Sequence, residues 1–231
     1  MDIKLHYTEQ GTGKPLILLH GNGEDLSYFE NQVPCFSQNF RVIAVDTRGH
    51  GQSPRGTGPF TLNRFSDDLM SFMDEMRIDK ASLLGFSDGA NIAILFALKY
   101  PEHVDRLVLD GANLFPLGLK LPVWLDIVAA GALASVKPAR TEKDVRNREL
   151  LRLMTREPHI SPSELSAIKA PTLVIAGTKD MIRESHTRLI GRSIPGSRIR
   201  FIEGDHFIAE KNSAAFNDCV MRFLCAPDDP D

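Results

Sequence analysis

Residues 83–90, with the sequence LLGFSDGA, decide the fold class of this chain. The apolar run 81–86 predicts a strand buried on both faces, and the apolar run after it predicts a helix packed against a sheet. Gly85 and Gly89 lie two residues before and after Ser87, the spacing of a serine on a sharp strand-to-helix turn. Larger side chains at the two glycines would clash with the crossing chain. By itself, this pattern fits a nucleophilic serine and an ordinary glycine-rich turn about equally well.

Strand and helix patterns alternate along the rest of the chain, which indicates a mostly parallel sheet with helices on both faces. A half-exposed strand is predicted at 3–10, buried strands at 15–21, 41–49, 81–86, 105–111, 171–180 and 197–206, and helices at 61–76, 89–101 and 213–224. Between the fourth and fifth buried strands there are only helix-like runs, at 121–136, 142–155 and 159–168. We therefore predict an α/β core formed by residues 1–112 and 167–231, with a small helical cap inserted at 113–166.

The composition excludes several classes of protein. Of 231 residues, 42% are hydrophobic and 25% are charged, which is typical of a globular domain and not of a disordered one. The net charge of −3 argues against binding to nucleic acid or to an anionic membrane. No secretory signal and no membrane-spanning run is visible. Cys35, Cys219 and Cys225 lack metal-ligand spacing and are expected to be free buried thiols. We expect a cytoplasmic monomer or homodimer that acts on a small molecule without metal or cofactor.

Polar and glycine residues follow every buried strand, and in such sheets functional groups gather at these carboxyl ends. A serine hydroxyl is a weak nucleophile and needs a base that is oriented by a third group. His206 and Asp180 follow the last two strands, and the order Ser87, Asp180, His206 suits this arrangement. We predict that these three residues form a catalytic triad. Asp110, at the end of the fourth buried strand, is the less favoured alternative for the acid, and Asp205 is expected to face solvent.

An acyl-transfer site also needs an oxyanion hole, built from two backbone N–H groups. We predict the N–H of Asp88, directly after the serine, and that of Asn22 in the loop HGNG at 20–23. The Asp88 side chain has two interpretations. An acid is favoured in the first turn of a helix by the helix dipole. Alternatively, its carboxylate faces the pocket and prefers a substrate with an amine near the ester.

The motifs HGNG (20–23), DTRGHGQS (46–53), GFSDGA (85–90), GTKD (177–180) and GDHF (204–207) resemble those of the α/β-hydrolase fold superfamily. The resemblance implies an eight-stranded, mostly parallel sheet with a helical cap, and the triad named above. The family's first strand is short or missing here, so seven strands are equally expected. In the loop that begins at residue 46, the resemblance implies structural roles for Arg48 and His50.

The predicted function is hydrolysis of a small to medium, largely apolar ester through an acyl-enzyme. Substrate contacts are expected from Gly21 and Phe86, and from Phe115 and Trp124 in the cap, although packing of the cap explains the last two equally well. The alternatives are a cofactor-free perhydrolase of the haloperoxidase type and a carbon–carbon bond hydrolase. A ligand-binding receptor with the same fold is a further, less favoured alternative.

Overall fold

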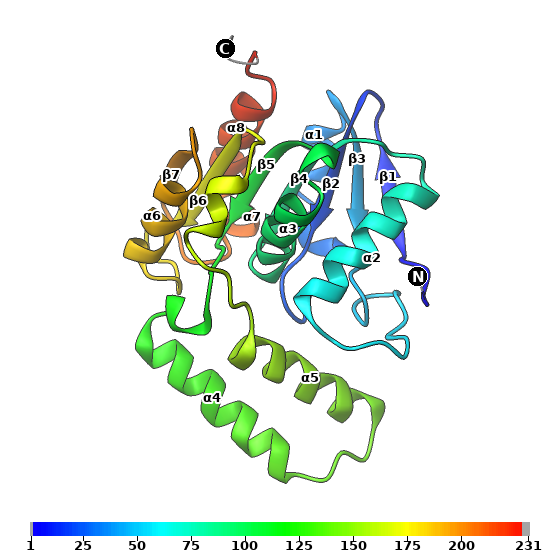
Figure 1. Ribbon diagram of the computed structural model, residues 1–231, viewed down its shortest axis with the longest axis vertical. Coiled ribbons are helices and arrows are strands. Elements are labelled where there is room, and N and C mark those ends of the chain that lie inside the picture. Colours follow the sequence, from blue (N-terminus) through cyan, green and yellow to red (C-terminus); the bar gives the residue numbers. More distant parts are fainter. Residues whose placement is uncertain (1, 228–231) are drawn as a thin grey trace.

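Figure 1 shows the computed structural model, which describes residues 2–227. In this part of the chain a seven-stranded sheet has the strand order β1-β3-β2-β4-β5-β6-β7. The strands are β1 Tyr7–Gln10, β2 Lys14–Leu19, β3 Phe40–Val45, β4 Ala81–Phe86, β5 Val104–Asp110, β6 Thr172–Gly177 and β7 Arg198–Ile202. All neighbouring pairs are parallel except β1 and β3. The predicted α/β class and mostly parallel sheet are confirmed, with the lower of the two expected strand numbers.

Successive side chains of a strand point to opposite faces of the sheet, so the buried strands place apolar side chains on both faces. Helices cover both of these apolar faces. In β2, for example, Ile17 packs in one core and Leu18 in the other. One face is covered by α2 (Leu62–Glu75), α3 (Asp88–Lys99) and α6 (Glu184–Ser193), and the other by α1 (Val33–Phe36), α7 (Ile208–Lys211) and α8 (Ser213–Leu224). Short 3-10 helices lie at η1 (Leu26–Phe29) and η2 (Pro101–His103).

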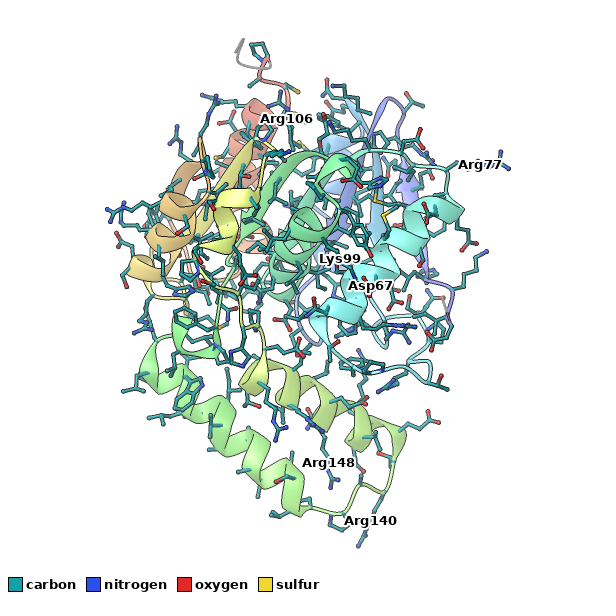
Figure 2. All side chains as sticks on the ribbon, in the orientation of Figure 1. Asp67, Arg77, Lys99, Arg106, Arg140 and Arg148 are labelled. Carbon is teal, nitrogen blue, oxygen red and sulfur yellow. The ribbon has the colours of Figure 1, made fainter. Side chains whose placement is uncertain are left out.

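Between β5 and β6 the chain forms two long helices, α4 (Leu121–Val136) and α5 (Glu142–Arg156), and two 3-10 helices, η3 (Pro116–Gly118) and η4 (Glu164–Ala167). Figure 1 shows α4 and α5 side by side, beyond one end of the sheet, and Figure 2 shows the side chains that they carry in the same orientation. The helix-like pattern at 159–168 yields only η4, because Pro162 restricts the residue before it and interrupts helix hydrogen bonding. Both long helices occur where the sequence predicts them.

The cysteine side chains lie closer to the surface than the sequence suggests. The three cysteines are free. Cys35 on α1 and Cys219 on α8 are only half-buried, and Cys225, directly after α8, is exposed. The expectation of buried thiols is therefore wrong. Within residues 2–227, every helix is too short or too polar to cross a lipid bilayer.

Candidate active site

Ser87 joins β4 to α3 with a positive φ of 53°, which a residue other than glycine adopts only where its surroundings enforce it. Its N–H donates a 2.8 Å hydrogen bond to the carbonyl of Asp110 on β5. A Cβ at Gly85 would lie 2.3 Å from the carbonyl oxygen of Gly89, and a Cβ at Gly89 would lie 2.0 Å from that of Leu19. Both glycines are therefore required by close backbone approach, as the spacing in the sequence indicated.

The imidazole of His206 and the carboxylate of Asp180 are both buried and lie in hydrogen-bond contact. Nδ1 of His206 is 2.8 Å from Oδ1 of Asp180, which also accepts the N–H of Ile182 at 2.8 Å. This geometry places the proton of the neutral ring on Nδ1 and leaves Nε2 as an acceptor. Nε2 has no hydrogen-bond partner among the described residues, and it faces the pocket that Ser87 also lines. Ser87 and His206 thus line one pocket, and Asp180 contacts the His206 ring without lining it.

Gly111, at the end of β5, lies directly against the imidazole of His206. A Cβ at this position would be 2.5 Å from Cε1 and 2.9 Å from Nδ1 of that ring. The residue adopts a φ of +62°. Only glycine satisfies both conditions at once, so Gly111 leaves the space that the ring occupies.

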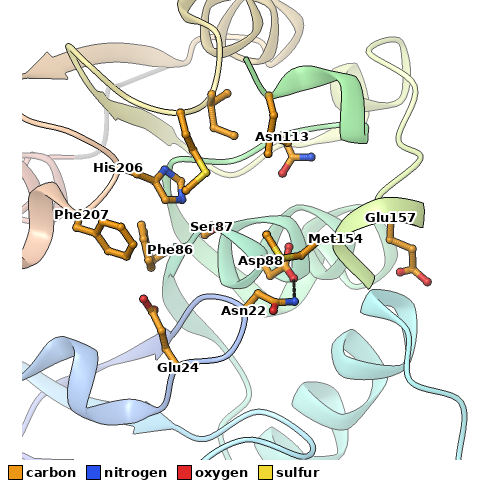
Figure 3. Close-up of a pocket in the computed structure, with 13 residues that line it drawn as sticks. Asn22, Glu24, Phe86, Ser87, Asp88, Asn113, Met154, Glu157, His206 and Phe207 are labelled. Atoms are coloured by element: carbon orange, nitrogen blue, oxygen red, sulfur yellow. Dashed lines mark hydrogen bonds between the residues drawn. The ribbon is translucent and has the colours of Figure 1, made fainter. Parts of the chain in front are cut away.

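The pocket is small, with a cavity volume of about 190 Å³, below the roughly 300 Å³ at which ligand pockets commonly begin. Figure 3 shows Ser87, His206 and Asn22 around it. Its apolar wall comes from Leu119 and Met154 of the segment between β5 and β6, together with Phe86, Met181, Ile182 and Phe207. Within residues 2–227 no group of His, Cys, Asp and Glu is arranged to hold a metal ion.

Three carboxyl groups also line the pocket: Glu24, Asp88 and Glu157. Burial raises the pKa of each of them, to about 7 for Glu24. Oδ2 of Asp88 accepts from the Asn22 side-chain amide at 2.8 Å, and Oε2 of Glu157 accepts the N–H of Leu62 at 2.7 Å. The lining contains no lysine or arginine. Sequence reasoning missed Glu24, although it directly follows HGNG, and no sequence signal pointed to Glu157.

The loop that carries Asn22 is fixed by two neutral histidines. Nδ1 of His20 lies 2.8 Å from the carbonyl of Gly21, and Nε2 of His50 accepts the N–H of Gly23 at 3.2 Å. Burial lowers the pKa of His20, and it lowers the pKa of His50 to about 3, so both rings stay neutral. The side-chain amide of Asn22 also lies 3.4 Å from the Leu150 carbonyl of α5. The backbone N–H groups of Asn22 and Asp88 have no acceptor among the described residues.

The structure separates the four predicted substrate contacts. Phe86 lines the pocket, whereas Gly21, Phe115 and Trp124 are not among the lining residues. Phe115 packs edge-on against His186, with ring centroids 4.6 Å apart, and joins the core. Trp124 is half-buried on α4. Packing of the cap, which the sequence allowed as an alternative, accounts for the position of Phe115.

The other acidic candidates have different surroundings. Asp110 is fully buried, and neither of its carboxylate oxygens has a hydrogen-bond partner among residues 2–227. Its pKa is raised well above the usual range by burial, and further by the charges of Asp180 and Glu24. Asp205 is half-buried, with 45% of its side chain accessible, and it pairs with Lys211 at 2.5 Å.

Arg48 has the structural surroundings that the resemblance implied. Its guanidinium is fully buried and forms two hydrogen bonds to Asp68, of 2.6 and 2.7 Å, and two to Asp2. These bonds tie the loop after β3 to α2 and to the first residues of the described chain.

Comparisons with known proteins agree with this architecture. The sequence pattern of the alpha/beta hydrolase fold family matches residues 14–133. Human serine hydrolase BPHL is 29% identical over 245 aligned residues, which cover 96% of this chain and 83% of that protein. The 2-hydroxy-6-oxononadienedioate/2-hydroxy-6-oxononatrienedioate hydrolase of Escherichia coli is 27% identical over 266 residues, covering 97% and 92%. The crystal structure of a hydrolase from Pseudomonas aeruginosa superposes with a TM-score of 0.80 at 27% identity, covering 97% and 95%. The chain therefore belongs to the alpha/beta hydrolase fold family and is a hydrolase.

Proposed function

We propose that the protein is a serine hydrolase that cleaves small carboxylic esters through an acyl-enzyme. The observation that carries this proposal is the His206 ring, which is oriented by Asp180 and presents an unpartnered Nε2 to the pocket of Ser87. A base with a free acceptor nitrogen beside a serine on a strained turn is the arrangement that activates a hydroxyl.

The reaction follows from these positions. Ser87 Oγ attacks the ester carbonyl while its proton passes to Nε2 of His206. The imidazolium is stabilised by the carboxylate of Asp180 and then gives the proton to the departing alcohol. The N–H groups of Asn22 and Asp88 hold the oxyanion. Water, deprotonated by His206, then attacks the acyl-enzyme and restores the hydroxyl of Ser87 as the acid departs.

The size and charge of the pocket restrict the substrate. A cavity of about 190 Å³ with one apolar wall suits a short acyl group. A dicarboxylate such as the one in the name of the Escherichia coli relative would meet the carboxyl groups of Glu24, Asp88 and Glu157, without a lining cation. This favours an ester over that carbon–carbon bond substrate. Residues 113–166 would act as the cap, since Leu119, Met154 and Glu157 come from this segment.

An ester that carries an amine is a second candidate substrate. It is favoured by the position of the Asp88 carboxylate, which lines the pocket and is held there by the side-chain amides of Asn22 and Asn91 at 2.8 and 3.3 Å. A carboxylate fixed in this way offers an ammonium group an oriented acceptor.

The test compares wild-type protein with Ser87→Ala on a series of p-nitrophenyl esters from acetate to octanoate. We expect turnover of the short esters that is lost in Ser87→Ala, and covalent labelling of Ser87 by a p-nitrophenyl phosphonate. Equal turnover in Ser87→Ala would refute the nucleophile. Absence of ester turnover together with tight binding of a small ligand would favour a receptor.

A further inference from the structure

Glu24 is a carboxyl group inside the candidate active site for which the triad has no use. It lies two residues after Asn22, and Figure 3 shows its side chain directed from the loop toward Phe86. It lines the same pocket as Ser87 and His206. Partial burial disfavours the ionised form of a carboxyl group. A half-buried carboxyl group in a reaction pocket is therefore a candidate for a functional role.

The side chain of Glu24 forms a hydrogen bond within its own loop. Oε2 of Glu24 accepts the N–H of Gly21 at 3.2 Å, and the N–H of Glu24 donates to the carbonyl of Gly21 at 3.4 Å. These two bonds close a short turn around Asn22 and Gly23. The side chain of Glu24 therefore holds the N–H of the His20–Gly21 peptide, while its backbone N–H holds the carbonyl of the next peptide, Gly21–Asn22. The side chain thus acts on the Asn22 N–H, the proposed oxyanion donor, through the conformation of Gly21.

Glu24 also interacts with neighbouring titratable groups through its charge. The titratable groups that act on Glu24 are Asp25 in the same loop, Tyr28 on η1, Asp110 at the end of β5, His206 after β7 and Glu210 on α7. Of these described groups, only His206 gains positive charge, and it does so in the transition state of the proposed reaction. An ionised Glu24 would stabilise that imidazolium across the pocket.

We propose that Glu24 is a positioning residue for the hydrolysis reaction. It orients the Asn22 N–H through Gly21, and in its ionised form it stabilises the positive charge on His206. This inference rests on the proposed function, because it assigns a role in the step that Ser87 and His206 carry out.

The charge part of this role depends on pH near neutrality. Burial is the main cause that raises the pKa of Glu24 to about 7, and the charges of Glu210 and Asp25 act in the same direction. Below that pH the carboxyl group is neutral and only its hydrogen bond to Gly21 remains. Above it the negative charge is present, so its support for His206 grows as the pH rises.

The experiment compares kcat/KM for p-nitrophenyl acetate, a neutral substrate, in wild type, Glu24→Gln and Glu24→Ala from about pH 5.5 to 9. Glutamine keeps an acceptor for the Gly21 N–H but removes the charge, whereas alanine removes both. Glu210→Gln is the matched control, because Glu210 is an exposed carboxyl group that also acts on Glu24 but makes no bond to the loop. Dividing the activity of wild type by that of each variant removes the pH dependence that the two proteins share.

For Glu24→Gln we expect the ratio of wild-type to variant activity to rise from about 1 at low pH to about tenfold at high pH, the factor that one pKa unit represents. Its midpoint should lie near pH 7, where Glu24 ionises. For Glu24→Ala we expect an additional loss of roughly tenfold at every pH, from the unfixed loop. The Glu210→Gln ratio should be about 1 at both ends of the pH range and deviate only near pH 7, because the charge of Glu210 helps to raise the pKa of Glu24.

A constant ratio for Glu24→Gln would overturn the charge role, and wild-type activity of Glu24→Ala would overturn the positioning role. Both outcomes are separable from failure of the proposed function, which would appear as ester turnover that survives Ser87→Ala. Thermal unfolding of each variant identifies a loss of folding. If Glu24→Ala does not fold, Glu24→Gln alone decides the charge role.

Discussion

Gly111→Ala is expected to inactivate the enzyme by moving the imidazole of His206. Ordinary van der Waals contacts of a Cβ are 3.4–4 Å long, whereas the new Cβ would lie 2.5 Å from Cε1. The ring must therefore move by about 1 Å, and a misplacement of that size in an active site costs about 10²-fold in rate. The positive φ at this position adds about 1 kcal/mol of destabilisation for an L-residue.

The same chain offers a matched control in Gly196→Ala. Gly196 has a φ of +67°, close to the +62° of Gly111, but a Cβ there would meet no atom within 4 Å. Urea unfolding should give similar losses of stability for both variants, and p-nitrophenyl acetate hydrolysis should fall only for Gly111→Ala. Wild-type kcat/KM in Gly111→Ala would refute the reasoning. Equal loss of activity in both variants would show that backbone strain, and not contact with the ring, is responsible.

Three further outcomes are expected. Arg48→Met should lower the free energy of unfolding, measured with urea, by about 3–5 kcal/mol, because the buried carboxyl group of Asp68 loses both of its short hydrogen bonds and keeps only the more distant Arg64, at 3.6 Å; a loss below about 1 kcal/mol would contradict this. Asp110 holds its proton longer in the folded state, so unfolding releases a proton and stability falls as the pH rises from 3.8 toward the raised pKa. The difference in stability between Asp110→Asn and wild type should therefore shift in favour of the variant as the pH rises. Urea unfolding midpoints that change by the same amount in both proteins from about pH 5 to 9 would count against a raised pKa. Asp88→Asn should lower kcat/KM by about 10- to 100-fold for amine-bearing esters alone, and an equal loss on neutral esters would exclude a specific contact with the amine.

The sequence alone permitted prediction of the sheet and of the edge at which Ser87, Asp180 and His206 lie, because both depend on local patterns. Buried strands are short apolar runs, and the residues after them meet at one edge of the sheet. The spacing of Gly85 and Gly89 also has a direct steric cause. The number of strands stayed open, because it depends on whether an edge strand has a partner.

Other features depend on tertiary proximity and leave no mark in a short stretch of sequence. Glu157 lines the pocket because α5 ends beside the start of α2, where Glu157 accepts the N–H of Leu62, and Phe115 lies outside it because His186 provides a packing partner. The missing partners of Asp110 and the raised pKa of Glu24 likewise follow from burial by distant residues. Such properties are set by the whole core and not by spacing along the chain.

The side-chain amide of Asn22 links two parts of the molecule that the chain order keeps far apart. It lies 2.8 Å from Asp88 on α3 and 3.4 Å from the carbonyl of Leu150 on α5. Any displacement of α5 away from the sheet therefore also breaks a contact of the loop whose N–H would hold the oxyanion. The position of α5 and the conformation of the proposed oxyanion loop are thus coupled through one asparagine.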